Sequence, residues 1–403
     1  MRLAERILKI QPSPTLEVAA LANALKAKGI DVISFGAGEP DFDTPRNIKD
    51  AAISAIEQGK TKYTPSGGIN ELKKAVADKF LRDNKLEYKL SEIIINSGGK
   101  HSIYNLMQVL LNDGDEVIIP SPYWVSYPPI VELAGGVPVI IDTTDETSFK
   151  ILPEQLKKAI TKKTRAVVIN SPSNPTGAAY TIDELKALAS VVEGTDILII
   201  SDDIYESILF DKFEFTNCAC FSPELKKQTV VLNGVSKTYS MTGWRIGYMA
   251  CDEEIIKKID ILQSQSTSNP TSIAQWASVE ALNGDQSIIS EMLSAFERRR
   301  RLIVDGLNAV PGFSCFNPNG AFYAFPKISG LYKMDGWKNI SEKYSSKYNS
   351  SKLTSFLLEE ARVAVVPGIA FGNDDYIRLS FATSDENIAK GLERINEAIK
   401  KIS

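Results

Sequence analysis

A lysine in unusual surroundings is the first residue of this sequence that suggests chemistry. Lys237 follows the apolar run 230–232, and Arg245 stands eight residues later, directly before another apolar run. A lysine that is partly removed from water gives up its proton more readily, and its free amine can form a Schiff base with a carbonyl compound. Because a lysine in a loop is most often only a solvated charge, this interpretation depends on the motifs around it.

A glycine pair provides a candidate anion site. Gly98, Gly99 and Lys100 follow the apolar run 93–95 and precede a stretch with the apolar periodicity of a helix. Backbone N–H groups at a helix start attract anions and are well suited to a phosphate. The pair could instead form a tight turn that needs the positive φ of glycine. The sequence has no Walker loop and no G-x-G-x-x-G after a strand, which disfavours nucleotide- and dinucleotide-dependent enzymes.

Polar residues end two further apolar runs. Asn174 lies in the loop after run 166–169, where two prolines and a glycine restrict the backbone and would hold its amide in place. Asp202 follows run 197–200, and a carboxylate at the end of a buried strand can bind a cationic ring nitrogen. Each residue could also be only a turn or a cap of the next element. Their value as site residues therefore depends on whether the fold brings them together.

The pattern of the chain predicts such a fold. Between residues 45 and 285, short apolar runs alternate with longer stretches of helical period, which indicates an α/β fold with a mostly parallel sheet and helices on both faces. Ligands of such sheets bind beyond the carboxyl ends of the strands. Thr181 and Glu184 form a capping-box pattern that predicts the start of one covering helix. We expect a large domain over 45–285 and a smaller α+β domain that combines 1–44 with 286–403.

The composition disfavours several classes of protein. The chain has 403 residues, of which 43% are hydrophobic and 24% charged, and its formal net charge is -4. It therefore offers no broad basic surface for nucleic acid or an anionic membrane. The start of the chain lacks the apolar core of a signal peptide, and no apolar run reaches the roughly 18 residues of a membrane helix. We expect a soluble, cytoplasmic protein without nucleic-acid or membrane partners.

The histidine and cysteine content narrows the chemistry. His101 is the only histidine, which disfavours Ser/His/Asp and Cys/His catalysis and most zinc-dependent hydrolysis. The four cysteines are too few for a disulfide scaffold at this length and match no zinc motif, so we expect idle thiols and no metal site. Some other group must move protons, and Lys237 is the candidate.

Three segments of the C-terminal third carry weaker patterns. Residues 297–301 read Glu-Arg-Arg-Arg-Arg in a helical stretch, where successive side chains point to all sides. We expect them to form a solvated face rather than a nucleic-acid site. Residues 321–325 have the composition of a strand, and residues 331–352 match no interpretable pattern.

Six motifs in order resemble those of the class I aminotransferases and cover essentially the whole chain. They are residues 98–100, 121–124, 173–177, 201–206, 236–247 and 378–382. Segments 37–45 and 120–127 are also similar to those of bacterial aspartate aminotransferases and their prephenate-using relatives. The resemblance implies a pyridoxal 5'-phosphate (PLP) enzyme of fold type I.

The resemblance implies a role for each residue around the cofactor. Lys237 would bind PLP covalently as an aldimine and would then move the proton between the substrate and the cofactor. Asp202 would pair with the pyridinium nitrogen of the ring. Asn174 and Tyr205 would hydrogen-bond its phenolic oxygen, and Trp124 would stack on its face. The expected catalytic residues are therefore Lys237, Asp202 and Tyr205.

The same resemblance places the cofactor phosphate at the helix start formed by Gly99 and Lys100. Arg245 would add a charge-assisted fork, and Ser236 or Thr238 would add a hydroxyl group. Tyr63 matches the family tyrosine that reaches the phosphate of the neighbouring subunit. The resemblance therefore implies a homodimer with shared active sites.

The substrate would lie, by the same resemblance, among Gly38, Trp124, Asn174 and Arg378. Arg378 would bind the α-carboxylate with both arms of its guanidinium group. Lys100 and Thr15 stand where this subgroup recognises a distal carboxylate. The resemblance therefore implies a dicarboxylic substrate, aspartate or glutamate, together with the matching 2-oxo acids.

The implied reaction is a ping-pong transfer of the amino group from aspartate or glutamate to a 2-oxo acid. Prephenate stays open as an acceptor, because Lys100 and Thr15 would serve its side-chain carboxylate too. A PLP-dependent lyase that cleaves C–S bonds could share the scaffold, whereas a transcription regulator with this domain would need an added DNA-binding module. Asp203 departs from the family, which usually has Glu there, and His101 is assigned no catalytic role.

Overall fold

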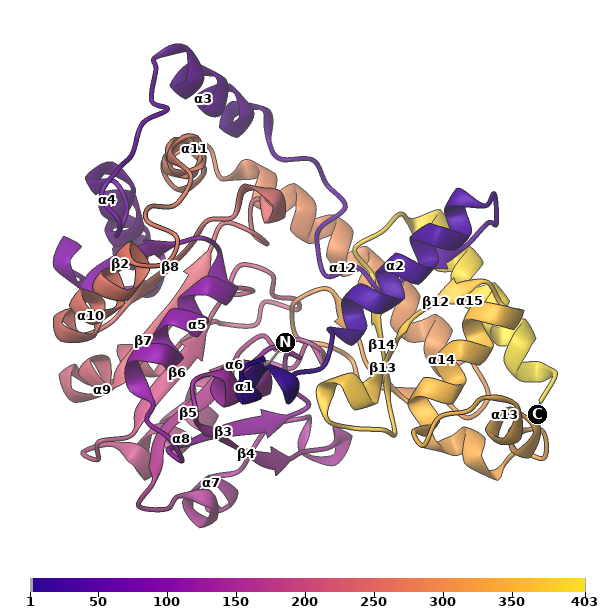
Figure 1. Ribbon diagram of the computed structural model, residues 1–403. Coiled ribbons are helices and arrows are strands. Elements are labelled where there is room, and N and C mark those ends of the chain that lie inside the picture. The colour runs from indigo at the N-terminus through magenta and orange to yellow at the C-terminus, as the bar shows by residue number, and fades with distance from the viewer. Residues whose placement is uncertain (1–2, 403) are drawn as a thin grey trace.

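In the computed structural model, which describes residues 3–402, a seven-stranded mixed sheet with its helices lies beside a smaller group of short strands and helices (Figure 1). The strands of the large sheet are, in order across it, β2 (Ile93–Asn96), β8 (Gly247–Ala250), β7 (Thr229–Gly234), β6 (Leu198–Asp202), β5 (Thr164–Asn170), β3 (Glu116–Ser121) and β4 (Val137–Asp142). Strand β8 runs antiparallel to β2 and β7, and the other neighbours are parallel. The predicted α/β fold with a mostly parallel sheet is confirmed.

The large sheet is buried on both faces because successive apolar residues of its strands point to opposite sides. In β2, Ile94 packs into the core on one face, and its neighbours Ile93 and Ile95 pack into the core on the other. The helices of the first face are α5 (Gly99–Leu110), α6 (Tyr127–Leu133) and α10 (Glu253–Ser264). The helices of the second face are α3 (Arg46–Glu57), α4 (Asn70–Lys79), α7 (Pro153–Ala159), α8 (Ile182–Val192), α9 (Pro223–Gln228) and α11 (Ser272–Asn283).

The smaller group combines the two ends of the chain. Strand β1 (Ile33–Ser34) pairs with β12 (Val363–Ala364), and β14 (Ile377–Ser380) lies between β10 (Tyr323–Ala324) and β13 (Val366–Pro367). Strand β9 (Ser314–Cys315) pairs with β11 (Pro326–Lys327). The remaining helices are α1 (Glu5–Leu8), α2 (Pro14–Ala27), α12 (Ser287–Asn308), α13 (Trp337–Lys343), α14 (Asn349–Glu360) and α15 (Asp385–Lys400). The exact domain limits at residues 45 and 285 stay a prediction.

Local predictions can be compared with these elements. The capping box that starts α8 is present, since Thr181 Oγ1 accepts from the Glu184 backbone and Glu184 in turn accepts from the Thr181 N–H. The strand expected within 321–325 is confirmed for Tyr323–Ala324, which form β10 and pair with β14, whereas Ala321 has a positive φ and lies outside the strand. Residues 331–352 form a short 3-10 turn, α13 and the start of α14.

The run of four arginines is the clearest difference from expectation. Arg299 and Arg300 are buried on α12, whereas Arg298 and Arg301 are exposed. Two of four successive helical side chains can face inward, since each residue turns the helix by about 100°. Arg300 pairs with Asp211, so its charge is neutralised in place. The predicted solvated face is therefore wrong for Arg299 and Arg300.

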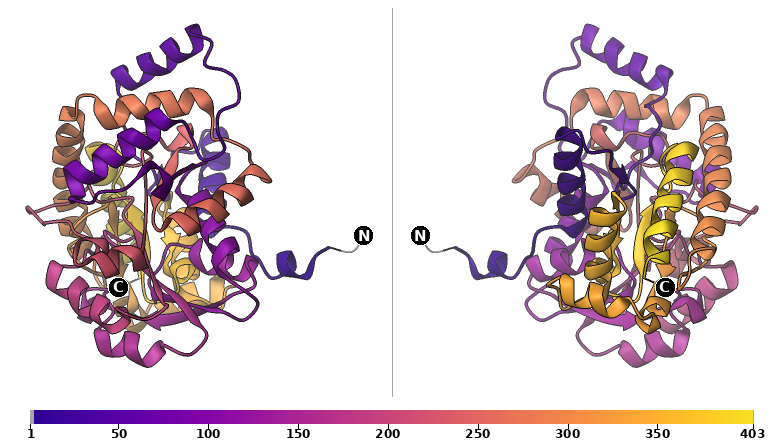
Figure 2. Two further views of the ribbon diagram at one scale, coloured as in Figure 1. Left: turned by 90° about the vertical axis from the view of Figure 1, so that its left-hand side faces the viewer. Right: turned by 90° about the vertical axis from the view of Figure 1, so that its right-hand side faces the viewer.

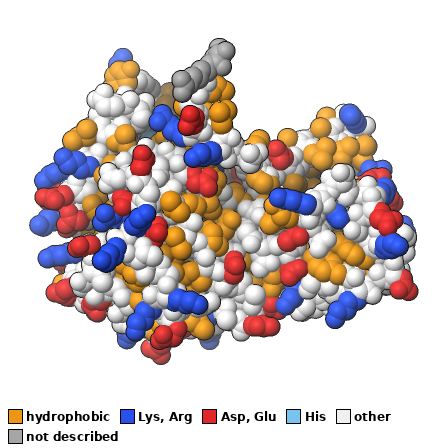
Figure 3. Space-filling model, turned by 60° about the horizontal axis from the view of Figure 1, so that its bottom comes forward, with side chains coloured by type: hydrophobic (Ala, Val, Ile, Leu, Met, Phe, Trp, Pro, Cys, Tyr) orange, Lys and Arg blue, Asp and Glu red, His pale blue; other side chains and the backbone are white. Residues whose placement is uncertain are grey.

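The surface and the thiols of residues 3–402 show no sign of a membrane span or a metal site. No helix in this range has the length and apolarity to cross a membrane. The same range contains no group of three His, Cys, Asp or Glu side chains placed to hold a metal ion. The four cysteines are free, and Cys220 is the exposed one. Figure 3 shows basic and acidic side chains interspersed over one face of the molecule.

Candidate active site

A cavity of about 710 Å³ lies at the carboxyl ends of the large sheet, against the smaller group. The predicted site residues that line it are Thr15, Gly38, Gly99, Lys100, Trp124, Asn174, Asp202, Tyr205, Ser236, Lys237, Arg245 and Arg378. Residues from five strand ends or helix starts and from both ends of the chain therefore meet in one place. The prediction that the motifs converge beyond the carboxyl ends of the strands agrees with this placement.

Lys237 follows β7 and is directed at the N-terminal segment. Its Nζ donates to the Gly38 carbonyl oxygen at 2.5 Å. Burial lowers the pKa of Lys237 from 10.5 to about 8; the neighbouring Glu39 carboxylate opposes the shift, and Arg245 and Arg378 add to it. A substantial fraction of the amine is therefore neutral near pH 8, which a nucleophile or general base requires.

Asp202, at the end of β6, is held from two sides. The Tyr127 hydroxyl donates to Asp202 Oδ2 at 2.5 Å, and the Asn170 side chain donates to the Asp202 carbonyl oxygen at 2.9 Å. Burial raises the pKa of the Asp202 carboxyl, while Tyr127 and Lys237 act in the opposite direction. A buried carboxylate fixed in this way can pair with a cationic ring nitrogen that enters the cavity.

Asp203, the departure from the family pattern, points elsewhere. Its carboxylate accepts from Ser201 at 2.6 Å and from Asn217 at 2.8 Å, and it does not line the cavity. Burial, together with the nearby Glu206, raises its pKa to about 8. The shorter side chain at this position therefore leaves the contacts of Asp202 intact.

The start of α5 forms a cradle that only glycines allow. Gly98 has a φ of 92°, and a Cβ there would overlap the Arg245 guanidinium group. A Cβ on Gly247 would overlap the Gly99 backbone nitrogen. The amides of Gly99 and Lys100 lie in the first turn, where a helix offers no acceptor of its own. Backbone donors and a guanidinium group therefore meet at one point, which is the donor set that binds a phosphate.

Arg378 is a buried cation that has no acidic partner in the part of the chain that the structure describes. It lies in β14, the central strand of its sheet, and is 2% exposed. Its Nη2 donates to the Gly36 carbonyl oxygen at 2.7 Å and its Nη1 to Asn174 Oδ1 at 3.2 Å, while its buried Nε has no partner among the described residues. The guanidinium lies over the ring of Tyr323 at 4.6 Å. A buried guanidinium with unused donor capacity suits a carboxylate ligand.

Three predicted residues line the outer part of the cavity. Lys100 Nζ lies 5.2 Å from the centre of the Trp124 ring. Burial lowers the pKa of Lys100, and the neighbouring Arg245 adds to this effect. Thr15 is in the first turn of α2, where its hydroxyl lies 2.9 Å from that of Ser13. These three residues therefore give the cavity wall a cation, an aromatic ring and a hydroxyl group.

Tyr63, a predicted site residue, and His101, which was assigned no role, both lie outside the cavity. Tyr63 is 91% exposed and does not line it. His101 accepts a hydrogen bond from the Ser97 backbone at 3.2 Å, so it supports the turn before α5 and does not face the cavity. Within one chain, the structure therefore separates Tyr63 from the other predicted site residues.

Sequence reasoning missed three residues that organise the site. Tyr127 and Asn170 hold Asp202. Tyr323 lies between Arg378 and Tyr205, and the hydroxyl groups of Tyr323 and Tyr205 are 2.8 Å apart. Tyr127 and Asn170 belong to motifs that were noted, so their position was a usable signal. Tyr323 lies in an apolar run that resembled ordinary core.

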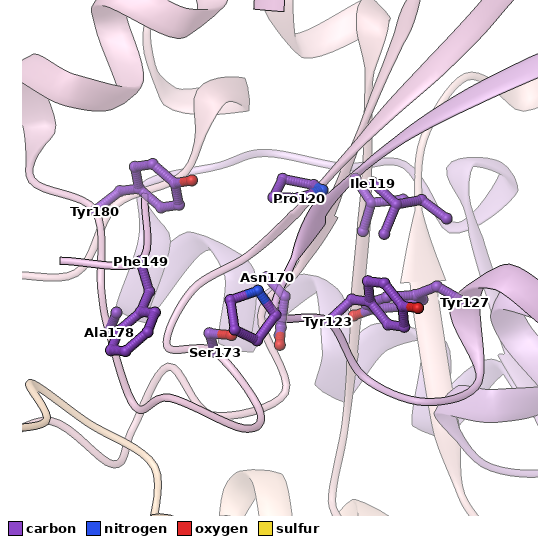
Figure 4. Close-up of a pocket in the computed structure, with 11 residues that line it drawn as sticks. Ile119, Pro120, Tyr123, Tyr127, Phe149, Asn170, Ser173, Ala178 and Tyr180 are labelled. Carbon is purple, nitrogen blue, oxygen red and sulfur yellow. The ribbon is translucent and has the colours of Figure 1, made fainter. Parts of the chain in front are cut away.

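A second, much smaller cavity adjoins the large cavity. Its volume is about 20 Å³, and Figure 4 shows Tyr123 and Tyr127 on one side of it and Phe149, Ala178 and Tyr180 on the other. It shares Tyr127 and Asn170 with the large cavity. A space of this size holds about one water molecule, so the large cavity is the candidate site for a substrate.

Known proteins resemble this chain along its whole length. Residues 30–395 match the family model described as aminotransferase class I and II. The chain is 53% identical to a protein named aspartate aminotransferase from Bacillus sp. (strain YM-2), over 99% of each chain. It is 52% identical to a protein named aspartate/prephenate aminotransferase from Nitrosomonas europaea, over 98% of this chain and 99% of the relative.

Solved structures agree with these matches. The crystal structure of the aspartate aminotransferase from Rhizobium meliloti has a TM-score of 0.94 and 46% identity, and the match covers 100% of both chains. The aspartate aminotransferase from Thermus thermophilus with maleate has a TM-score of 0.90 and 43% identity, over 99% of this chain and 100% of that one.

Proposed function

The chain belongs to the class I and II aminotransferase family, and from that premise we propose that it transfers the amino group of aspartate to a 2-oxo acid with PLP as its cofactor. The single observation that carries the proposal is that Lys237 and Arg378 face one cavity while neither has a hydrogen-bonded carboxylate partner within residues 3–402. An amine and a free guanidinium group at one cavity suit an amino acid at its Cα and its α-carboxylate.

The donor set of the cavity fits PLP. The phosphate would be held by the amides of Gly99 and Lys100, by Arg245 and by Ser236, in a cradle where a Cβ at Gly98 would overlap Arg245. The ring would be held by Asp202 at its nitrogen, by Asn174 and Tyr205 at its phenolic oxygen and by Trp124 on its face. When bound, PLP supplies an electron sink for the negative charge that develops at the substrate Cα.

Lys237 would hold the cofactor in the resting enzyme and move the proton of the reaction. Its amine loses a proton more readily than an exposed lysine, because burial lowers its pKa to about 8. Such a group can take the proton from Cα as a base and return it as an acid. Asp202, fixed by Tyr127, would keep the ring nitrogen protonated by charge pairing.

The substrate would be held at both ends. Arg378 would bind the α-carboxylate, next to Asn174 and the backbone at Gly38. Lys100 and Thr15 would bind the distal carboxylate at the outer wall. The names of the relatives, aspartate aminotransferase among them, support a dicarboxylic amino acid.

Prephenate is a second candidate acceptor. A relative with 52% identity carries the name aspartate/prephenate aminotransferase. Prephenate has a 2-oxo acid group that Arg378 would bind and a further carboxylate that Lys100 and Thr15 would accept. The two activities can coexist, because the same residues would serve both acceptors.

We also propose that the protein works as a homodimer. Tyr63 is 91% exposed, and Leu3, Ile7 and Leu8 of the N-terminal arm are 49–62% exposed. This arm projects from the side of the molecule (Figure 2). Exposed apolar side chains of this kind are suited to a partner surface. Tyr63 would then reach the phosphate site of the partner subunit. The cytoplasmic location expected from the sequence remains a prediction.

The experiment is a half-reaction screen of the purified protein. Bound PLP gives a visible absorbance band, and we expect aspartate and glutamate to bleach it, with the amino group recovered on 2-oxoglutarate, oxaloacetate or prephenate. Faster bleaching by alanine or by aromatic amino acids would contradict the roles of Lys100 and Thr15. Release of a keto acid from a Cβ–S substrate without any acceptor would instead indicate a lyase.

A further inference from the structure

One short stretch of backbone contacts both cations of the site. In segment 36–42, the Gly36 carbonyl oxygen accepts from Arg378 Nη2 at 2.7 Å, and the Gly38 carbonyl oxygen accepts from Lys237 Nζ at 2.5 Å. Glu39 accepts from the Thr242 hydroxyl at 2.6 Å. The position of this segment therefore determines where two functional side chains rest.

The segment is held firmly on its N-terminal side. Phe35, directly before it, exchanges backbone hydrogen bonds with two strands: its N–H donates to the Ala364 carbonyl oxygen, and its carbonyl oxygen accepts from Ser380, each at 2.8 Å. Gly36 and Gly38 themselves provide no side chains that could hold the backbone. Restraint from the other side must therefore come from residues further along.

That restraint is an ion pair with a buried arginine of α12. Arg299 donates through Nη1 and Nη2 to the two carboxylate oxygens of Asp41, at 2.8 and 3.0 Å. The Arg299 side chain is 8% exposed and that of Asp41 29%. The ring of Phe42 packs edge-on against Phe296. The Arg299 guanidinium lies 5.1 Å from the centre of the Phe42 ring. A paired fork of this kind fixes orientation as well as distance.

Arg299 also reaches a third element. Its Nε donates to Asp385 at the start of α15, at 3.3 Å. Arg298 donates to the same carboxylate at 2.6 Å but has no bond to segment 36–42. The two arginines therefore share one partner, and only Arg299 connects it to the segment.

We propose that Asp41 and Arg299 are positioning residues for the substrate carboxylate, acting through the Gly36 carbonyl oxygen on Arg378. This inference rests on the proposed function, in which Arg378 binds the α-carboxylate. If the pair is broken, segment 36–42 loses its only ion-paired restraint among the described residues and is held beyond Phe35 by the hydrogen bond from Thr242 to Glu39 and by the packing of Phe42 on Phe296. Arg378 then loses the fixed acceptor of its Nη2 and presents its fork in several orientations. Binding of substrate becomes weaker. In the loaded enzyme, Lys237 would be attached to the cofactor instead of donating to Gly38, so it would keep its place, as would Asp202 on the sheet.

The test compares variants of Asp41 in the PLP-loaded enzyme. We expect Asp41→Ala to raise the KM for aspartate by ~10-fold and to change kcat by less than ~3-fold, because weakening a contact made equally in the ground state and the transition state raises KM and leaves kcat nearly unchanged. Asp41→Glu keeps a carboxylate and should restore KM to within ~3-fold of wild type. Arg298→Gln is the matched control, since it removes a bond to Asp385 without touching the segment, and its KM should stay at the wild-type value.

The visible absorbance of bound cofactor gives the concentration of folded enzyme in each sample, so partial unfolding does not alter the kcat calculated, and KM does not depend on the enzyme concentration. An unchanged KM in Asp41→Ala, or an equal rise in Arg298→Gln, would overturn the inference. A fall in kcat alone would also overturn it. Absence of transamination in the wild type, by contrast, would contradict the proposed function itself.

Discussion

Two buried cations in this molecule have opposite surroundings. Lys79 on α4 is 4% exposed and donates to Glu206 and to Asn84 Oδ1. Arg378 is 2% exposed, has no carboxylate as a hydrogen-bond partner and keeps an unpaired Nε. A buried charge is costly unless another group pairs with it. The charge of Lys79 is therefore balanced within the fold, whereas Arg378 is left for a ligand.

Lys237 resembles Arg378 in its hydrogen bonding. Its Nζ donates to a carbonyl oxygen and not to a carboxylate. The nearest acids influence its charge, but burial dominates and lowers its pKa to about 8. Both residues of the cavity therefore depend on what binds there, and their substitution should affect function more than folding.

The largest effect is expected from Lys237→Ala. Without the amine, the enzyme loses both the covalent attachment of its cofactor and the group that moves the proton, so the rate of transamination should fall by ~10⁴-fold or more. The half-reaction rate with aspartate measures this loss. The melting temperature should stay close to that of wild type. A turnover above ~1% of the wild-type value in Lys237→Ala would contradict the catalytic role of Lys237.

Glu206→Ala tests the other side of the comparison. It leaves Lys79 buried with the Asn84 side chain and with Asp83, whose carboxylate is 3.8 Å away. Removing one partner of a buried pair costs about 3–5 kcal/mol of unfolding free energy, which urea denaturation measures. The double variant Lys79→Met/Glu206→Gln removes both charges and should lose less. An equal loss in both variants would mean that packing, and not charge, explains the effect.

Arg378→Lys should affect binding and spare the fold. Lysine keeps the charge but loses the planar fork, so the KM for aspartate should rise by ~100-fold while the cofactor band remains. The melting temperature should not fall, because the wild-type guanidinium has no acid to lose. Arg300→Lys is the matched control: Arg300 is paired with Asp211, so this change should lower stability and leave KM unchanged. A lower melting temperature with unchanged KM in Arg378→Lys, or a raised KM in Arg300→Lys, would contradict the difference between paired and unpaired cations.

Residue placement shows which parts of this comparison a sequence can predict. Asn174, Asp202 and Lys237 follow the neighbouring strands β5, β6 and β7, so an alternating pattern of strands and helices was enough to bring them together. The pair of Arg299 with Asp41 joins residues 258 positions apart, and no local pattern indicates it. Burial of a charge is decided by tertiary partners, which explains why the arginine run was expected in solvent.

The smallest effect concerns pH and separates two buried groups that share a pKa of about 8. In the cofactor-free protein, Lys237 has its pKa lowered by burial from 10.5 to about 8, so between these values the unfolded chain binds more protons and stability rises with pH. Asp203 has its pKa raised by burial from 3.8 to about 8, so between these values the folded state binds more protons and stability falls as pH rises.

Relative to wild type, Asp203→Asn should gain roughly 1–3 kcal/mol of unfolding free energy from pH 5 to pH 8. Lys237→Met should lose a similar amount from pH 8 to pH 10. Thermal unfolding at a series of pH values checks both slopes, and slopes of the same sign would show that one of the two groups is not buried in its neutral form.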